Sequence, residues 1–456
     1  MAYIPDTGAS QTVVMNNTGT LASSSNQQAL LNQLASVVTT YGPTGTSARS
    51  TMEVSFDVDA TAIDAFGRMR TSDPAYRFDG QQVYPNSGDV WDTFTTNGSF
   101  AFDSVNRFTT VYASAGTNVS VMQSHYYAPY TPGRSQLSFI TFNMRTAPVT
   151  GQTKRVGYFD GSNGVFLEWD AATGVSVNIV SGTALGNQKV LQASWNIDKM
   201  DGTGRSGRTL DLTKVQILAV SLQALYAGRV IIGFDIDGQL WPVHQFKHAN
   251  LVTDPYLQQA SLPVRYESRG TNASNATSLD AICATVISEG GVELLEIPGR
   301  TFSISSGTVT TSVSSRRPVL TIRPKRNFNG VPNNTVVVPQ RFSSFVVTNY
   351  MRYELVRNGT VTGPANTPYT DVDSTNSTVE YNTNGTAISG GQAVYTDYAT
   401  GTAKFADTIF PSAIGRLLLS YSSLLPQNAA DTFSFVVTPL SGTPSVIAGL
   451  GWKEIR

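Results

Sequence analysis

The strongest constraint on the fold is an alternation of apolar and polar residues with a period of two, interrupted by short turns. It is clearest in the segment 229–246, where the alternating apolar residues are Val230, Ile232, Phe234 and Ile236. Asp237 and Gly238 follow and suit a two-residue turn with positive φ. In the returning strand Pro242 cannot donate to a ladder, so we expect that strand at a sheet edge or a bulge. A Gly-rich turn within 158–169 predicts a second hairpin.

Repeated hairpins of this kind predict a mainly β fold with two antiparallel β-sandwich domains that are jelly-roll-like. A length of 456 residues also exceeds the ~250–300 residues that one core supports. The expected divisions are an extended docking arm (1–22), a helical attachment segment (23–52), a connecting segment (53–95), a central β-sandwich (96–298), a linker (299–325) and a C-terminal β-sandwich (326–456). The linker is predicted because it is rich in Ser, Thr, Arg and Pro.

An amphipathic helix is predicted in the attachment segment. Ser25 and Gln28 have the spacing of a capping box, and Gly42 with Pro43 ends the pattern. Its apolar stripe consists of Leu30, Leu31, Leu34, Val37, Val38 and Tyr41. Two alternatives remain open: the helix packs on its own domain, or it bundles with copies of itself or docks on a partner. The stripe therefore supplies the candidate residues for oligomerisation and anchoring.

The low charge of the chain excludes several function classes. Only 14% of residues are charged, against a typical ~25%, and Ser, Thr, Asn and Gly take their places. With 31 basic and 32 acidic residues and no basic block, we expect no nucleic-acid partner. There is no run of ~18–20 apolar residues and no signal-peptide pattern, so we expect no membrane insertion and synthesis in the host cytoplasm.

Two short motifs resemble sites but lack the required context. The string 202–207 matches GxGxxG, yet a strand pattern follows it where a dinucleotide site needs a helix, so we expect a loop. His244 and His248 are four residues apart as in HExxH, but Gln245 replaces the Glu and both follow a strand. Zinc chemistry is not expected.

Acidic pairs and the lone cysteine carry no catalytic constellation. The pairs are Asp57/Asp59, Asp235/Asp237 and Asp371/Asp373. None supplies the six to eight oxygens that calcium needs, although the first and last could form loop sites with backbone carbonyls. Cys283 lies in an apolar strand pattern and is expected to be a buried small residue. We therefore predict no catalytic residue, no metal, no cofactor and no enzyme activity.

Aromatic residues suggest a carbohydrate contact as one alternative. Trp169 stands beside Glu168, and Tyr126 and Tyr127 form a second aromatic group. Aromatic faces at a surface could hold a sugar ring. The other interpretation is that these rings belong to the core.

Several strings match a known family. They are 64–74 (DAFGRMRTSDP), 155–159 (RVGYF), 201–214, 262–267 (LPVRYE), 286–291 (VISEGG), 387–391 (AISGG) and 452–455 (WKEI). With them the chain resembles virion structural proteins of tailed bacteriophages, especially those of marine and freshwater bacteria including cyanophages. The resemblance runs from about residue 60 to the end. It implies a particle component without catalysis, and the first 55 residues outside it fit an attachment module.

The resulting expectation is an oligomeric virion protein of the tail, baseplate or fibre-attachment region, anchored by its N-terminus. A homotrimer is favoured by analogy with fibres and spikes, and its partners would be other virion proteins. The alternatives are a capsid decoration (cement) protein or head fibre, and an adhesin module that binds a host surface glycan. In each case the expected location is the virion.

Overall fold

The computed structural model describes residues 74–456 except 87, 293–295, 312–314, 347–348, 365–367, 401–403, 410–416, 422–423 and 425–429. The predicted arm, the helix with its six candidate anchoring residues, and residues 53–73 lie outside the described residues. All described residues belong to one compact unit, 58–456. Within them η1 (Gln192–Ser194) is a short 3-10 helical turn. No helix of the described part has the length and apolarity required to span a membrane.

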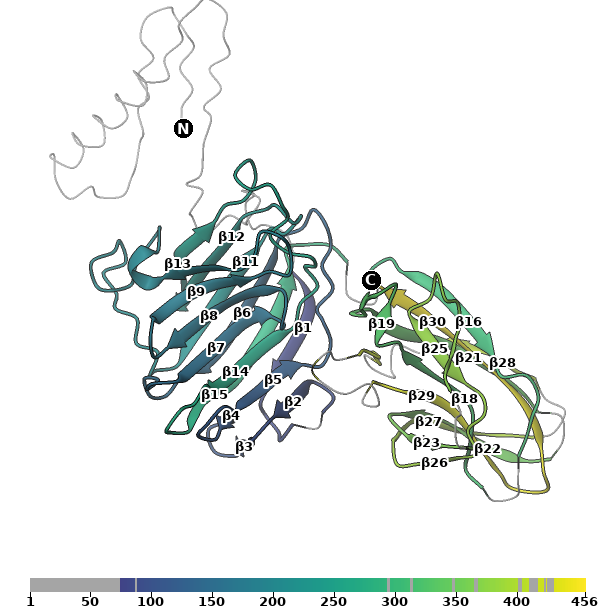
Figure 1. Ribbon diagram of the computed structural model, residues 1–456. Coiled ribbons are helices and arrows are strands. Elements are labelled where there is room, and N and C mark those ends of the chain that lie inside the picture. Colours follow the sequence, from purple (N-terminus) through teal and green to yellow (C-terminus); the bar gives the residue numbers. More distant parts are fainter. Residues whose placement is uncertain are drawn as a thin grey trace, which may run out of the picture. The chain divides into compact units, whose positions relative to one another are not determined.

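The first sandwich consists of two antiparallel sheets that pack face to face (Figure 1). Among the described residues the eight-stranded sheet has the order β13 (Gln239–Phe246), β12 (Val230–Ile236), β11 (Gln216–Leu222), β6 (Gln136–Asn143), β15 (Thr277–Ser288), β4 (Phe108–Ala113) and β3 (Gly98–Asp103), and β1 (Ala75–Gln81) also pairs with β15. The seven-stranded sheet has the order β10 (Gln188–Leu191), β9 (Gly174–Val180), β8 (Gly164–Asp170), β7 (Gln152–Phe159), β14 (Val264–Gly270), β5 (Val119–Ser124) and β2 (Trp91–Thr95).

Strand alternation explains how these sheets enclose one core. In β8 the side chains of Val165 and Leu167 are fully buried in the cluster that also holds Ile140 and Phe142 of β6. Complete burial of such a side chain contributes about 1.5–3 kcal/mol. Because every second residue points into this core, the intervening residues of the seven-stranded sheet face outward.

Both predicted hairpins are confirmed. β12 and β13 are joined by Asp237 and Gly238, whose φ angles are 59° and 76°. β13 lies at the sheet edge. The register shifts between Ile232, which pairs with His244, and Gly233, which pairs with Pro242. Pro242 therefore sits both in an edge strand and at a bulge, where its missing N–H costs no ladder hydrogen bond. β7 and β8 form the second hairpin.

The second sandwich contains the remaining strands. In the described residues its five-stranded sheet has the order β16 (Arg300–Ser305), β30 (Ser445–Ile455), β21 (Val336–Val346) and β28 (Lys404–Ile409), with β17 (Val309–Thr310) also pairing with β30. Its six-stranded sheet has the order β24 (Thr370–Asp371), β25 (Val379–Asn382), β18 (Arg317–Pro324), β29 (Phe433–Pro439), β22 (Met351–Arg357) and β27 (Gln392–Ala399). Two short ribbons are β19 (Asn327–Phe328) with β20 (Val331–Pro332), and β23 (Thr360–Thr362) with β26 (Ala387–Ser389).

The two sandwiches begin earlier than the sequence pattern indicates. β1 and β2 pair with strands of the first sandwich, although the boundary was expected at residue 96. The linker predicted at 299–325 is wrong, because β16, β17 and β18 are strands of the second sandwich. Ser and Thr occupy the outward positions of β16, and Arg and Pro stand at the ends of the buried strand β18. Polar composition therefore concealed strands whose other face is apolar.

Candidate functional site

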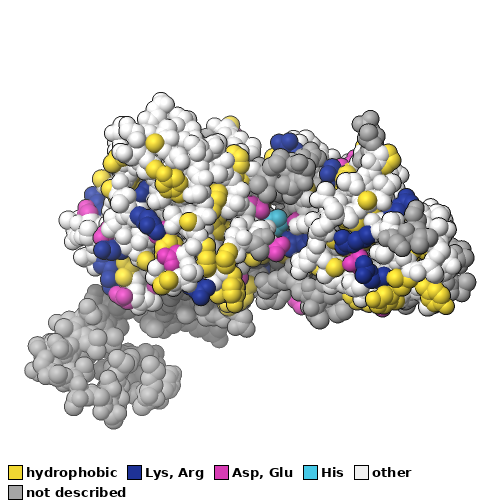
Figure 2. Space-filling view, turned by 90° about the horizontal axis from the view of Figure 1, so that it is seen from below, with side chains coloured by type: hydrophobic (Ala, Val, Ile, Leu, Met, Phe, Trp, Pro, Cys, Tyr) yellow, Lys and Arg dark blue, Asp and Glu magenta, His cyan; other side chains and the backbone are white. Residues whose placement is uncertain are grey.

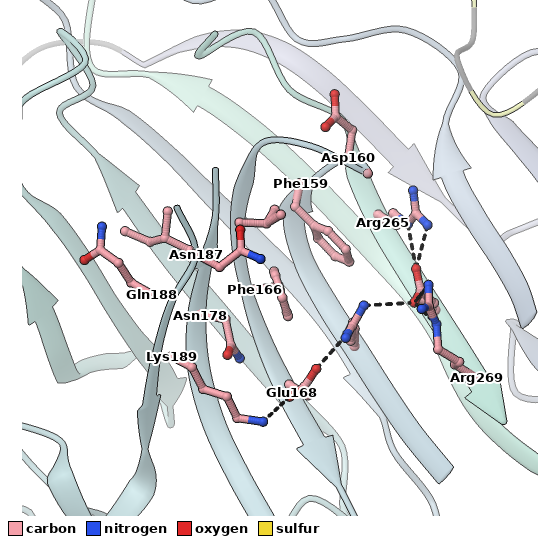
Figure 3. A pocket seen from close by; sticks show the side chains of 15 residues that line it. Phe159, Asp160, Phe166, Glu168, Asn178, Asn187, Gln188, Lys189, Arg265 and Arg269 are labelled. Carbon is pink, nitrogen blue, oxygen red and sulfur yellow. Dashed lines mark hydrogen bonds and ion pairs between the residues drawn. The ribbon is translucent and has the colours of Figure 1, made fainter. Parts of the chain in front are cut away.

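A groove of about 400 Å³ lies on the outward face of the seven-stranded sheet. Its walls come from β7, β8, β9, β10 and β14, and from the turn at Asp160 and Gly161. Figure 3 shows the side chains that line it, most of which are charged or carry amides. Because the floor is made of paired strands, these side chains stand on rigid backbone.

The register of three strands brings opposite charges into one row. Glu168 of β8 and Glu267 of β14 alternate with the core residues Leu167 and Tyr266. Arg155 of β7 lies between them, because it is the cross-strand partner of both glutamates. Cross-strand neighbours on one face are close enough for direct side-chain contact.

Hydrogen-bonded ion pairs continue along this row. The Nε of Arg155 donates to the Oε2 of Glu168 at 2.7 Å, and its Nη1 donates to the Oε1 of Glu267 at 3.3 Å. From the other side, the Nζ of Lys189 donates to the Oε1 of Glu168 at 2.7 Å. The resulting chain of alternating charges joins residues of β10, β8, β7 and β14 and passes over β9, and Figure 3 marks its contacts with dashed lines.

Glu267 gathers three guanidinium groups. Besides Arg155, its Oε2 accepts from the Nη2 of Arg265 at 2.6 Å, and its Oε1 accepts from the Nε of Arg269 at 3.0 Å. The residue is only 1% exposed. Burial by itself would raise the pKa of this carboxyl, but the three arginines hold the pKa below its ordinary value. Glu267 is thus a buried anion that fixes the positions of the arginines around it.

Two phenylalanine rings support the guanidinium groups. The centroids of Phe159 and Phe166 lie 4.5 Å apart with planes inclined by 32°. The Cζ of Arg265 is 5.3 Å from the centroid of Phe159, and the Cζ of Arg155 is 5.2 Å from that of Phe166. Both rings are buried, so they form a floor beneath the cations and stabilise them through cation–π contacts.

Three amides complete the lining. The Nδ2 of Asn178 donates to the Oγ of Ser176 at 3.0 Å, and the Oδ1 of Asn187 accepts from the N of Ser181 at 2.9 Å. Gln188 contacts His248, with 3.1 Å between Nε2 and Nε2. Each amide is therefore held by one neighbour while it lines the groove, which reduces the entropy lost when a ligand binds.

The aromatic residues predicted to contact a glycan do not lie in this groove. Trp169 is half-buried and packs against the core, on the opposite face of β8 from Glu168. The hydroxyl of Tyr126 donates to the carbonyl of Arg77 at 3.0 Å, and its ring also packs on the core. Tyr127 is 1% exposed. The prediction of an exposed Tyr127 is therefore wrong, whereas the glycan contacts predicted for Trp169 and Tyr126, which are half-buried, stay predictions.

The histidine and glycine motifs are structural. His244 and His248 are both buried, and the ring of His248 stacks on Tyr256 with 4.0 Å between centroids. The string 202–207 lies in a turn-rich loop ahead of β11, as expected. Among the described residues, no group of three or more His, Cys, Asp or Glu side chains could hold a metal ion.

The acidic pairs are engaged by their own surroundings. Asp371 pairs with Lys325 at 3.0 Å, and Asp373 accepts from the backbone N–H groups of Thr375 and Asn376. Asp57 and Asp59 lie outside the described residues. Asp235 accepts from the N of Gly238 within the hairpin turn.

Cys283 lies in β15, as predicted, but its solvent exposure is intermediate, so it is not the fully buried residue that the sequence predicts. Burial raises the pKa of its thiol, which disfavours the reactive thiolate.

A second hollow of about 640 Å³ lies on the five-stranded sheet, over β16, β21 and β30. Its lining is mostly serine, glycine and apolar residues, with Arg341 as the charged side chain. Gly449 and Gly451 leave this part of the face without side chains. It offers few groups that could orient a ligand, so the charged groove is the stronger candidate.

Comparisons with known proteins give no family. No family model matches the sequence, and no curated protein matches it. Among solved structures, similar chains include the carbohydrate recognition domain of Emp46p in its potassium-bound form, with 9% identity over 47% of this chain and 98% of that one and a TM-score of 0.28. The VIP36 exoplasmic/lumenal domain, in a Ca²⁺/Man3GlcNAc-bound form, has 13% identity over 48% and 91%, with a TM-score of 0.31. Bacillus licheniformis β-glucanase has 11% identity over 49% and 100%, also with a TM-score of 0.31. Values this low carry no information about function.

Proposed function

We propose that this protein is a glycan-binding adhesin and that the charged groove of the seven-stranded sheet holds the saccharide. The observation that supports this most directly is the row Glu267, Arg155 and Glu168, extended by Lys189, in which fixed donors and acceptors alternate across rigid strands. A saccharide presents hydroxyl groups that both donate and accept at regular spacing. The groove offers guanidinium, carboxylate and amide groups that can pair with such hydroxyls.

The electrostatics of the groove favour binding over hydrolysis. A glycosidase needs one carboxyl with a raised pKa that protonates the leaving oxygen. The pKa of Glu267 is lowered, and both oxygens of Glu168 accept from cations. Neither glutamate has the environment of a general acid, so we propose that the protein is not an enzyme.

A phenylalanine at position 161 is expected to block the groove. Gly161 lines it, its φ is not positive, and a Cβ there would meet no atom within 4 Å. A large ring can therefore enter the open space without backbone strain. Saccharide binding of the intact chain, located on a glycan array and measured by calorimetry, should weaken by at least about tenfold in Gly161→Phe.

Gly161→Ala is the matched control, because it alters the same backbone position and leaves the space largely open. It should bind like the wild type, and both variants should unfold at the wild-type temperature. If Gly161→Phe bound saccharide as well as Gly161→Ala, the ligand would not occupy this groove. If the wild type bound no saccharide, the adhesin proposal itself would fail.

A second proposal concerns where such an adhesin works. The resemblance of residues 60–456 to virion structural proteins supports a phage particle component, anchored by its first residues. Figure 2 shows a face on which most of the described surface is neither charged nor apolar, and the cations form small groups. Such a surface raises little repulsion between neighbouring copies, which suits an oligomer such as a trimer. Tail and capsid positions would differ in copy number per particle.

Deleting residues 1–45 tests the anchoring. We expect a chain that folds normally, because the described sandwiches do not include these residues, but that no longer enters particles. Circular dichroism would check folding, and quantitative mass spectrometry of purified virus would measure incorporation against the full chain. Wild-type incorporation of the truncated chain would refute an N-terminal anchor.

A further inference from the structure

We infer that the groove selects saccharides that carry negative charge, as carboxylate or sulfate groups, through a cluster of three arginines organised by Glu267. This inference rests on the proposed function, since it names the class of glycan that the same groove takes. The cluster consists of Arg155, Arg265 and Arg269.

The groove lining carries an excess of positive charge. The full lining contains one more cation than carboxylates, because Arg155, Lys189, Arg265 and Arg269 face Asp160, Glu168 and Glu267. The third carboxylate, Asp160, is already engaged: its Oδ1 accepts from the N–H groups of Ser162 and Asn163, and its Oδ2 accepts from Gln259.

The surplus positive charge is concentrated around Glu267. One carboxylate there faces three guanidinium groups, and it is buried beneath them. Arg155 shares Glu168 with Lys189, so that carboxylate does not balance the cluster. An anionic group of a ligand would supply the missing negative charge in a site whose cations are already oriented.

Guanidinium donors remain available to a ligand. Neither Nη1 of Arg269 nor Nη2 of Arg155 has a hydrogen-bond partner among the residues that the structure describes. The side chains of Arg269 and Arg155 are 42% and 27% exposed, whereas that of Glu267 is 1% exposed. A ligand entering the groove therefore meets arginine nitrogens and does not meet the carboxylate that holds them.

Planar guanidinium groups match carboxylate and sulfate oxygens in geometry as well as in charge. The phenylalanine floor and Glu267 hold these arginines in place before a ligand arrives, which lowers the entropic cost of binding. An extended groove with amides beside the cluster favours a saccharide over an isolated anion, because the amides offer partners for neighbouring hydroxyl groups.

The test compares acidic saccharides with neutral counterparts of the same skeleton. The probes are oligogalacturonate and its methyl ester, sialyllactose and lactose, and a heparin-derived oligosaccharide and its desulfated form. Calorimetry on the full chain should detect an acidic member and weaker binding of its counterpart, with affinity that falls as salt rises. Arg269→Ala should weaken that acidic ligand by about tenfold and should weaken a neutral ligand clearly less, because the neutral ligand loses a hydrogen bond but no charge pairing.

Arg145→Ala is the matched control. Arg145 also has a side chain that is 42% exposed and also pairs with a buried carboxylate, that of Asp280 at 2.7 Å, but it lies outside the groove. This variant should bind like the wild type. Equal affinity for acidic and neutral members, or unchanged binding by Arg269→Ala, would overturn charge selection while leaving glycan binding intact. Equal affinity for poly-L-glutamate would overturn the saccharide class, and binding of no saccharide would overturn the proposed function as well.

Discussion

Replacing His125 with alanine is expected to lower the free energy of unfolding by about 3–5 kcal/mol, because it removes the imidazolium that lies between two buried carboxylates. The Nδ1 of His125 contacts Asp92 at 2.8 Å, and its Nε2 contacts Asp431 at 2.6 Å. Burial alone would lower the pKa of this imidazole, but hydrogen bonds to Asp431 and Asp92 raise it to about 10. His125 is therefore a cation at neutral pH, held between two anions.

The partners of His125 come from distant parts of the chain. Asp92 belongs to β2 of the first sandwich, and Asp431 lies just before β29 of the second, separated from it by Thr432. Asp431 also accepts from the Nδ2 of Asn358 at 2.8 Å and lies 3.6 Å from the Nη2 of Arg357. The imidazolium thus links residues of both sandwiches, and its loss should destabilise them together.

The expected pH dependence of the stability follows from the raised pKa of His125. The pKa of folded His125 lies above the ordinary 6.5, so its stabilisation is complete below about pH 6.5 and is lost as the pH rises through about 10. The difference between wild type and His125→Ala should shrink over that range. Urea unfolding of both proteins at several pH values between these limits would measure it.

His244→Ala is the control for the loss of a buried ring. Both histidines are 5% exposed, but burial lowers the pKa of His244 to about 4, so this ring is neutral at pH 7. Its removal should cost less than that of His125, and the cost should not change between pH 6.5 and 10. Equal, pH-independent losses in the two variants would mean that His125 only fills space.

Replacing Glu267 with glutamine is expected to cost about 3 kcal/mol of stability and to abolish ligand binding in the groove. Glutamine keeps the shape but removes the charge that three guanidinium groups share, and its NH₂ would face N–H donors. Because the pKa of Glu267 is lowered, its stabilisation is present above the ordinary pKa of 4.5 and is lost as the pH falls. Wild type and Glu267→Gln should therefore converge in acid.

Glu380→Gln provides the comparison. Glu380 pairs with one guanidinium, that of Arg323 at 2.6 Å, and its side chain is 13% exposed. The loss there should be about 1 kcal/mol, and saccharide binding should be unchanged. Unfolding curves and calorimetry on the three proteins would measure both effects. A Glu267→Gln protein as stable as Glu380→Gln would show that the arginine cluster does not depend on its central carboxylate.

The sequence predicts the pairing of neighbouring strands well, because a hairpin is determined by residues that are adjacent in the chain. Alternation and the Asp237-Gly238 turn specify β12 and β13, and the position of Pro242 follows from its missing N–H. The boundaries at 96 and 299–325 could not be placed in this way. β1 and β18 gain their stability from strands far away in the chain, and local composition does not record such partners.

Part of the groove can be predicted from the sequence, and part cannot. The sequence suggests Trp169 as a glycan contact, with a place in the core as the alternative. In the structure Trp169 packs against the core, and its neighbour Glu168 faces the groove. Extending the predicted hairpin by its register would have paired Arg155 with Glu168. The alternation of Arg265, Glu267 and Arg269 was a further signal of a charged face.

The remaining step required knowledge of the sheet order. β14 lies beside β7 although more than a hundred residues separate them, as Figure 1 shows. The residues of the segment 264–270 do not indicate that β7 is the neighbouring strand. The contact between Arg155 and Glu267 therefore depends on the sheet topology and could not be predicted from local sequence. The candidate anchoring residues from Leu30 to Tyr41 stay a prediction, because they lie outside the described residues.

Most of the groove stands on strand interiors, and this limits how the proposed glycan preference could change during evolution. In β8 and β14 residues that face the groove alternate with core residues, so the insertion or loss of one amino acid there would exchange Glu168 with Trp169, or Glu267 with Tyr266. Binding loops diversify by changing length, a route that is closed to the groove residues in β8 and β14. New specificities would have to arise by substitution at fixed positions, and each substitution would also have to be compatible with folding.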